Sequence, residues 1–103
     1  MPHRSKETLT SFVDLFGLLS DRTRLRLVLM VAKGERNVIS LCEELEMPQS
    51  TVSHHLGLLR MNGLIVGKRE GKQVIYSLTS NAKAAGGKLK ISLPPYSVTV
   101  EGY

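Results

Sequence analysis

A proline separates two helical patterns in the stretch LCEELEMPQSTVSHHLGLLRMNGLI, residues 41–65. Met47-Pro48 ends the first pattern, because a residue that precedes proline is pushed out of the helical region. On both sides of the break, apolar residues recur at the three- and four-residue spacing of a helix face. These positions are Val38, Leu41, Cys42 and Leu45 before the break, and Val52, Leu56 and Leu59 after it. We therefore expect a short helix capped by Asn37, a tight turn, and a second helix over residues 49–62.

Two further helices are expected upstream of this pair. Their apolar positions are Leu9, Phe12, Val13, Phe16 and Leu19 in the first helix, and Leu25, Val28, Leu29 and Ala32 in the second. Leu27 and Val31 widen the second apolar face, so we expect that helix to be buried on most sides. Ser20 or Asp21 can cap it.

Three arginines, Arg22, Arg24 and Arg26, fall in the first turns of this second helix. Cations at that end oppose the helix dipole, so the helix alone does not favour them. We expect them to have carboxylate or phosphate partners.

After the fourth helix the apolar spacing changes from the helical period to alternation. Residues 64–66 and 74–78 predict two strands, joined by a charged connection over residues 68–72 that contains the turn glycine Gly71. Helix, helix, short turn, helix and then a basic hairpin is the layout of a winged helix-turn-helix. The expected fold class is mainly α with a β-hairpin wing (α+β).

The end of the chain is expected to form a separate tail. We assign residues 1–79 to the winged helix-turn-helix domain and residues 80–103 to the tail. The expected tail segments are a helical turn over residues 81–85, ended by Gly86-Gly87, and then two short strands or an extended arm over residues 88–93 and 96–100.

Length and charge limit the possible functions. The chain has 103 residues, enough for one small domain. Its net charge is +5, and the whole excess lies in residues 52–103, where seven Lys and Arg residues face only two Glu. A basic half on a small domain points to a polyanionic partner, with nucleic acid the leading candidate. Aromatic residues make up only 5%, which disfavours a base-stacking surface for single strands.

The sequence also predicts the cellular compartment. Cys42 is the only cysteine, which excludes an internal disulfide and fits a reducing cytosol. The longest apolar run, residues 27–32, is far too short to span a membrane, and the start MPHRSKETL has no apolar signal segment. We therefore expect a cytoplasmic protein without membrane contact.

The outer face of the helix at residues 49–60 has the chemistry needed to contact double-stranded DNA. Hydroxyl, amide and imidazole groups can bond base edges in the major groove, and this face contains no carboxylate that would repel the DNA backbone. The charged hairpin can reach phosphates or the minor groove. The candidate DNA-binding residues are Gln49, Ser50, Thr51, Ser53, His54 and Arg60 on the helix, and Lys68, Arg69 and Lys72 on the hairpin.

The nearby histidines and the cysteine are interpreted as structural residues. His54 and His55 are adjacent, so on a helix they point about 100° apart and cannot easily bind one metal ion together. We expect His54 to face outward and His55 to lie at the edge of the core. Cys42 falls on an inward helical face, where a buried, unreactive thiol is expected.

In combination, three segments resemble the ArsR/SmtB family of bacterial winged-helix transcriptional repressors. They are LSDRTRLRLVLMV (residues 19–31), LCEELEMPQSTVSHHLGLLRMNGLI (residues 41–65) and KREGKQVIYSL (residues 68–78). The resemblance implies a homodimer that binds a palindromic operator and blocks transcription. It assigns base reading to Gln49, Ser50, Ser53 and His54, and wing contacts to Arg69 and Lys72.

The sequence departs from the family pattern at three places. Asn37 and Ile39 stand where metal-sensing members carry two of the cysteines of a C-x-C-x-x-C motif, which leaves only Cys42. The tail contains no Asp or His, and Gly and Pro pairs interrupt any helix there. Glu46 replaces the usual turn glycine, and Pro48 replaces the usual capping Ser. We therefore expect no cofactor and no resident metal site, and a dimer contact made by the first helix with help from the tail.

Two other interpretations stay open. One is a sensor that releases DNA when Cys42 binds a metal or is oxidised. The other is a protein-interaction module on a winged-helix scaffold. We do not expect an enzyme, because no Ser-His-Asp or Cys-His arrangement, phosphate-binding glycine loop or pair of carboxylates is apparent.

Overall fold

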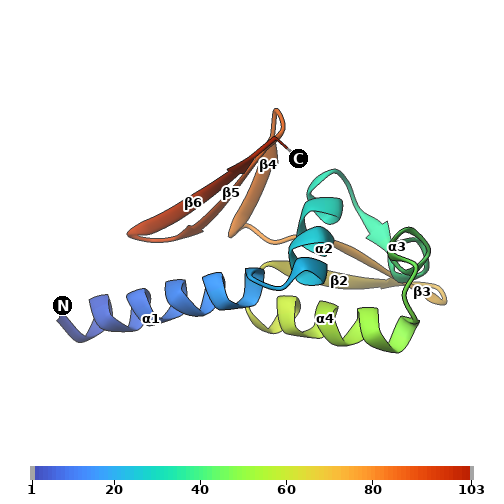
Figure 1. The fold of residues 1–103 in the computed structure, drawn as a ribbon, viewed down its shortest axis with the longest axis horizontal. Helices are drawn as coiled ribbons and strands as arrows, with labels where there is room; N and C mark the ends of the chain where they lie inside the picture. The colour runs from blue at the N-terminus through green and yellow to red at the C-terminus, as the bar shows by residue number, and fades with distance from the viewer. Residues whose placement is uncertain (1, 103) are drawn as a thin grey trace.

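Four helices and two three-stranded antiparallel sheets make up the part of the chain that the computed structural model describes, which is residues 2–102, with side chains from residue 11 onward (Figure 1). The elements are α1 (Pro2–Leu19), α2 (Arg22–Ala32), β1 (Arg36–Asn37), α3 (Val38–Leu45), α4 (Gln49–Met61), β2 (Ile65–Glu70), β3 (Gln73–Leu78), β4 (Ala82–Ala85), β5 (Lys88–Leu93) and β6 (Tyr96–Glu101). The strand orders are β1-β3-β2 and β4-β5-β6. The winged helix-turn-helix prediction is confirmed.

Side-chain caps begin two of the helices, as the sequence predicts. Asp21 accepts a hydrogen bond from the backbone N–H of Arg24 at 3.0 Å, and this bond is the main reason why the pKa of Asp21 is lowered. Asn37 accepts from the N–H of Ser40 at 2.8 Å. Pro48 begins α4 without a side-chain cap. The helix boundaries therefore follow local capping chemistry and the proline.

The turn between α3 and α4 needs a left-handed residue. Glu46 ends α3 with φ at 55°, and its N–H bonds back to the last turn of the helix. A residue with a side chain is strained in this conformation by about 1 kcal/mol. This is the position at which the family pattern has glycine.

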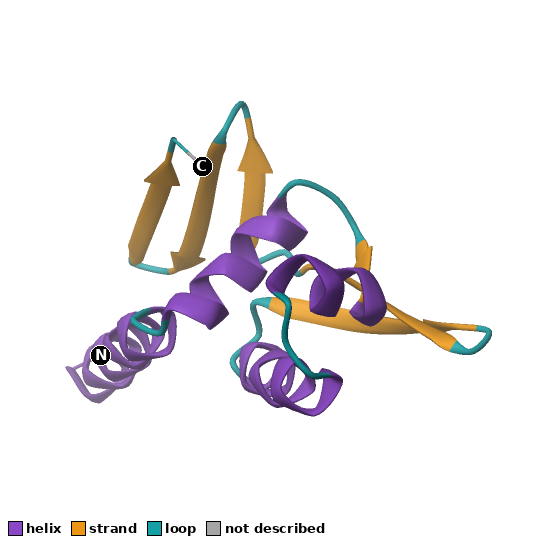
Figure 2. Cartoon of the chain, turned by 45° about the vertical axis from the view of Figure 1, so that its right-hand side comes forward, coloured by secondary structure: helices purple, strands orange, loops and turns teal. Residues whose placement is uncertain are grey.

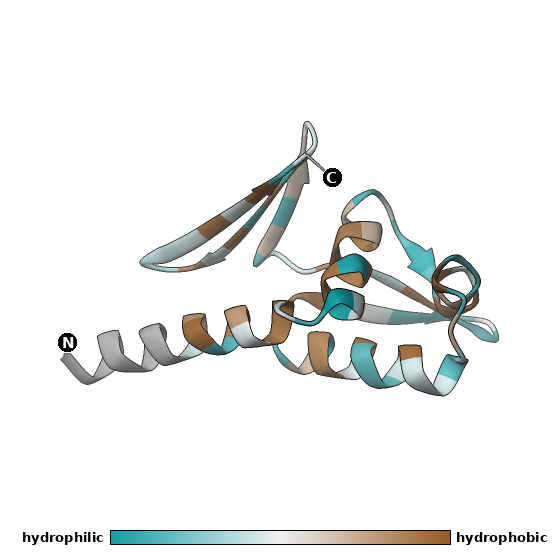
Figure 3. Cartoon of the chain, viewed as in Figure 1, coloured by the Kyte–Doolittle hydropathy of each residue, from teal (hydrophilic) through white to brown (hydrophobic). Residues whose placement is uncertain are grey.

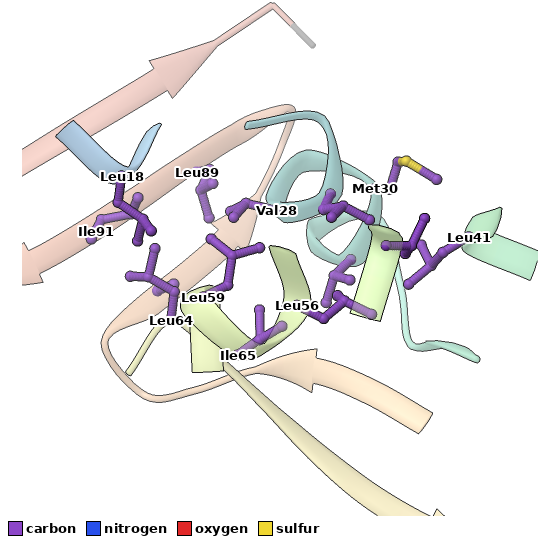
Figure 4. Packing of buried hydrophobic residues seen from close by; sticks show 14 of the residues in the cluster. Leu18, Val28, Met30, Leu41, Leu56, Leu59, Leu64, Ile65, Leu89 and Ile91 are labelled. Carbon is purple, nitrogen blue, oxygen red and sulfur yellow. The ribbon is translucent and has the colours of Figure 1, made fainter. Parts of the chain in front are cut away.

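One apolar cluster joins both sheets to the helices. Its fully or nearly fully buried members include Leu27, Val28 and Val31 of α2, Leu41 of α3, Val52, Leu56 and Leu59 of α4, and Leu89 and Ile91 of β5. Figure 4 shows Leu59, Leu64, Leu89 and Ile91 gathered at one end of the cluster, and Met30 with Leu41 at the other. The inward positions predicted for α4 are all confirmed.

The apolar stripe of α1 is divided between the core and the surface. The helix itself is confirmed, and Phe12 and Leu19 of the predicted stripe pack partly buried against the core, but the buried residues of α1 are Leu15 and Leu18. Val13 and Phe16, which the sequence placed on one stripe, are 58% and 52% exposed. The side chain of Leu9 lies outside the described residues. An exposed apolar surface therefore remains on α1.

The hairpin after α4 is longer than predicted. Strands β2 and β3 pair without a break from Ile65↔Leu78 to Glu70↔Gln73, so that only Gly71 and Lys72 form the connection. The five-residue connection expected over residues 68–72 is therefore wrong. Gly71 has φ at 63°, which permits a two-residue hairpin turn and lets the strands extend further.

The tail is a sheet from its beginning. The helical turn predicted over residues 81–85 is wrong, because Ala82–Ala85 form strand β4. Gly86 and Gly87, at φ values of 58° and 75°, make a two-residue turn that pairs β4 with β5. Alanine has the highest intrinsic helix propensity of all residues, but propensity is a weak prior, and the pairing of β4 with β5 overrides it here. The two strands predicted after the turn are confirmed as β5 and β6.

Figure 2 shows this C-terminal sheet, β4-β5-β6, as a separate layer over α1 and α2. Its inward residues Ala82, Leu89 and Ile91 belong to the common core, which therefore crosses the boundary expected at residue 79. None of the helices in the described part of the chain is both long and apolar enough to cross a membrane.

Candidate DNA-binding surface

Helix α4 has a buried side and an exposed polar side. Val52, Leu56 and Leu59 are at most 1% exposed, and they hold the helix against the core. The opposite side carries the helix residues that are predicted to contact DNA. Gln49, Ser50, Thr51, Ser53, His54 and Arg60 are all exposed, and α4 contains no acidic residue. Six candidate residues thus share one accessible helix, as the spacing predicts.

Arg24 ties α4 to the two preceding helices. Its Nε donates to the carbonyl oxygen of Leu18 at 2.7 Å, and its Nη1 lies 3.5 Å from Nδ1 of His55. One guanidinium therefore spans the end of α1, the start of α2 and the inner edge of α4. The sequence indicated that this arginine needed a partner, but a carboxylate or phosphate was expected rather than a carbonyl and an imidazole. Arg22 and Arg26 are exposed.

The two adjacent histidines have different environments, as predicted. His54 is exposed, whereas His55 is half-buried beside Arg24. Their ring centroids are 5.8 Å apart and their planes are inclined by 59°. Within the described residues, no group of three or more His, Cys, Asp or Glu side chains is placed to hold a metal ion.

The wing presents its cations on both faces of a ribbon. Lys68 and Arg69 are consecutive in β2 and lie opposite Ile75 and Val74 of β3, so their side chains point to opposite faces. Lys72 sits in the turn, and all three cations are exposed. Figure 1 shows α4 along the lower edge of the molecule and the hairpin projecting beyond it. In Figure 3 the far end of this hairpin is coloured mainly hydrophilic.

Cys42 is less buried than predicted. Its side chain is half-buried and packs against the core, next to the exposed Glu43. The expectation of a buried thiol is therefore met only in part, since the side chain packs against the core but is half-buried. An eight-residue helix turns only its Leu41 and Leu45 side fully inward, which leaves Cys42 at the margin.

An exposed polar helix held at the end of a helix-turn-helix, followed by a basic hairpin, defines a winged helix-turn-helix protein of the DNA-binding class. Residues 21–66 match the family model described as "Bacterial regulatory protein, arsR family". The chain is 40% identical over 78 residues to the arsenical resistance operon repressor of Escherichia coli, with 75% of this chain and 67% of that protein covered. It belongs to the ArsR family of winged helix-turn-helix, DNA-binding transcriptional repressors.

Solved structures agree with this assignment. Reduced HlyU from Vibrio cholerae superposes with a TM-score of 0.69 at 31% identity, covering 75% of this chain and 81% of that one. The homodimeric winged helix-turn-helix domain of Mb0332 from Mycobacterium bovis gives a TM-score of 0.68 at 28% identity, covering 73% and 69%. The chain spans between 50% and 77% of the length of eight of the curated relatives that it matches.

Proposed function

We propose that this protein represses transcription as a homodimer bound to a palindromic operator. The observation that carries the proposal is the exposed polar face of α4, which has no acidic residue and lies beside a basic wing, in a chain of the ArsR family. Each protomer inserts α4 into the major groove, and its wing contacts the flanking backbone or minor groove.

The side chains divide into base-reading and backbone-binding groups. Gln49 pairs with adenine, and His54 donates to a purine acceptor. Ser50, Thr51 and Ser53 bond bases or phosphates. Phosphate contacts are assigned to Arg60, Lys68, Arg69 and Lys72. All of these side chains are exposed, which supports their assigned roles.

The exposed apolar surface of α1 supports the dimer. Val13 and Phe16 are more than half exposed, and Phe16 makes an edge contact with Phe12. Phe12 in turn stacks on Tyr96 of β6, with ring centroids 5.2 Å apart. The winged helix-turn-helix domain of the Mycobacterium bovis relative, which superposes over 73% of this chain, is homodimeric. We assign the contact between protomers to α1 and the adjoining part of β6.

Regulation without a resident metal is a further part of the proposal. Asn37 caps α3 and Ile39 is an exposed apolar residue, so neither supplies a soft-metal ligand. Repression that is equally strong with and without chelator, and with Cys42→Ser, supports this view. If a metal or an oxidant releases the protein from DNA and the Cys42→Ser variant is no longer released, the result would instead support a thiol sensor.

The first experiment is a fluorescence-anisotropy titration with DNA from upstream of the protein's own gene and with a scrambled duplex. We expect tighter binding to the native duplex and a steep dependence on salt at two concentrations. Ser53→Ala or His54→Ala should weaken specific binding by about 1–3 kcal/mol. Arg69→Ala should weaken binding to both duplexes and reduce the salt slope by about one unit.

Lys90→Ala is the matched control, because Lys90 is an exposed cation on the C-terminal sheet. It should leave the salt slope unchanged. Equal, weak binding to both duplexes, unaffected by the Ser53 and His54 substitutions, would contradict base reading by α4. If Arg69→Ala leaves the salt dependence of DNA affinity unchanged, the wing does not contact the DNA.

A further inference from the structure

A pocket of about 400 Å³ opens beside the C-terminal half of α2, outside the proposed DNA-binding surface. Side chains from α2, β1 and α3, together with the capping residue of α2, line it. They are Arg26, Leu29, Met30, Lys33, Arg36 and Glu44. The volume falls in the range of small-molecule sites, which is roughly 300–1,000 Å³.

The floor of this pocket is apolar. Leu29 is half-buried and Met30 is 7% exposed. Figure 4 shows Met30 beside Leu41, at the margin of the core cluster. The pocket therefore offers a ligand an apolar surface that is continuous with the core, including a thioether that adapts to ligand shape.

The rim of the pocket is positively charged. Three cations, Arg26, Lys33 and Arg36, surround it, with Glu44 as the only carboxylate. Arg26 and Lys33 form no ion pair with any side chain among residues 11–102. The C-terminal dipole of α2 adds only about half a negative charge, so the site keeps a net positive charge.

Arg36 is held in place for recognition. Its Nε donates to Oγ of Ser40 at 3.0 Å, and its Nη2 donates to the carbonyl oxygen of Ser40 at 3.2 Å and to Oε1 of Glu44 at 3.0 Å. The side chain is 26% exposed. None of its hydrogen bonds within residues 11–102 uses Nη1, so the two N–H groups of Nη1 remain available to a ligand in the pocket that Arg36 lines.

We propose that this pocket binds a small organic anion with a compact apolar body, such as an aryl or short alkyl carboxylate. The apolar body lies on Leu29 and Met30, and the anionic group is bound by Arg36, Lys33 and Arg26. The combination of an apolar floor with converging cations selects against two simpler ligands. A neutral hydrocarbon leaves the cations unused, and an inorganic anion leaves the floor uncovered.

The same residues connect the pocket to the DNA-binding elements. Arg36 lies in β1, opposite Tyr76 of the wing strand β3, and bonds Ser40 and Glu44 of α3, the first helix of the helix-turn-helix. Figures 1 and 2 place the end of α2 on the side of the molecule away from α4, so a ligand can bind while DNA is bound. An anion that competes with Glu44 for Arg36 therefore changes operator affinity. This second step rests on the proposed function.

The binding step is tested without DNA, by NMR titration of the full-length protein with benzoate. We expect saturable shifts in the backbone amides of residues 29–36 and in the Met30 methyl signal. The double variant Arg26→Ala/Lys33→Ala should raise the Kd at least fivefold. Lys83→Ala/Lys90→Ala, which removes two exposed lysines from the C-terminal sheet, is the matched control and should not change the Kd.

Benzyl alcohol and inorganic phosphate test the two parts of recognition separately, because the first has only the apolar body and the second has only the anionic group. Both should bind at least tenfold more weakly than benzoate. Equal binding of benzyl alcohol would overturn the proposal in favour of a nonspecific apolar surface. Shifts confined to α1 would overturn it too, since they would place benzoate at the proposed dimer contact.

The coupling step is tested by repeating the DNA titration with and without benzoate at constant ionic strength, with chloride as the control anion. We expect an at least threefold change in operator affinity that Arg26→Ala/Lys33→Ala abolishes. If benzoate binds in the NMR titration but does not change the DNA affinity, the coupling to DNA binding is overturned, whereas the proposed ligand site still stands. If the protein binds no DNA, the NMR titration still tests the site. Weakened DNA binding by the double variant without ligand would reassign these cations to DNA.

Discussion

The helix-turn-helix region and the C-terminal sheet contribute to one core but present different surfaces. Leu59 of α4 and Leu89 of β5 are both completely buried in the same cluster. Outside the core, α4 exposes a polar face without carboxylates, whereas the sheet exposes lysines that face each other, with Lys83 opposite Lys90. The sheet therefore packs on the same core, and its exposed lysines lie outside the proposed DNA-binding surface.

This difference shows what net charge can and cannot locate. The basic excess of the second half of the chain divides between two places. Arg60, Lys68, Arg69 and Lys72 lie on α4 and the wing, whereas Lys83, Lys88 and Lys90 lie on the C-terminal sheet. Figure 1 shows the elements that carry the two groups, α4 with the wing and the C-terminal sheet, on opposite sides of the molecule. The charge predicted a polyanionic partner, but only the fold separates the cations near α4 from those far from it.

The largest expected effect tests whether the two regions unfold together. We expect Leu59→Ala and Leu89→Ala each to lower the free energy of unfolding by about 2–5 kcal/mol, because each leaves a cavity in one shared core. Urea unfolding followed by circular dichroism should show a single transition for both variants, with the m-value of the unsubstituted protein.

Two outcomes would separate the regions. A Leu89→Ala protein with the stability of the parent would make the sheet an appendage. A second, earlier transition in that variant alone would show that the sheet unfolds independently, and would support a domain boundary near residue 79.

The helix-turn-helix was predictable because its signals are local. Pro48 ends one helix and begins another, Asn37 caps by a single hydrogen bond, and the inward spacing of α4 needs no partner to be recognised. The polar face of α4 follows directly from that spacing. These features depend on residues within one or two turns of each other.

The features that the sequence missed depend on partners outside their own helix or strand. Ala82–Ala85 becomes a strand because residues 88–91 pair with it across the Gly86-Gly87 turn, which overrides local preference. The contact of Arg24 with His55 and the pocket around Arg36 join residues that are far apart in sequence. Neither leaves a periodic pattern, so spacing could not reveal them.

A smaller effect compares one glycine from each region. Gly57 lies inside α4 and Gly87 lies in the β4–β5 turn at φ of 75°; an added Cβ meets no atom within 4 Å at either position. The same change to alanine should therefore have opposite effects. Gly57→Ala should raise the free energy of unfolding by about 0.5–1 kcal/mol. Gly87→Ala should lower it by about 1–2 kcal/mol, through backbone strain alone.

Thermal and urea unfolding of the two variants check this pair, and each variant serves as the control for the other. Destabilisation by Gly57→Ala would contradict an unstrained helical position there. A neutral Gly87→Ala would mean that the turn changes its conformation at little cost, and that the sheet register does not depend on it.

The smallest expected effect removes strain from the turn between α3 and α4. Glu46 has φ at 55°, whereas the turn glycines of the C-terminal sheet hold similar values without strain. Glu46→Gly should raise the free energy of unfolding by a few tenths to about 1 kcal/mol, because relief of strain is partly offset by the greater freedom of glycine in the unfolded chain.

Glu46→Ala is the control, since it removes the carboxylate but keeps the Cβ. If alanine stabilises the protein as much as glycine in urea unfolding, the acidic surface beside Glu43 and Glu44 explains the gain. If only the glycine variant is more stable, the backbone at residue 46 is the strained point. The α3–α4 turn then differs from the turns of the C-terminal sheet in residue type rather than in conformation.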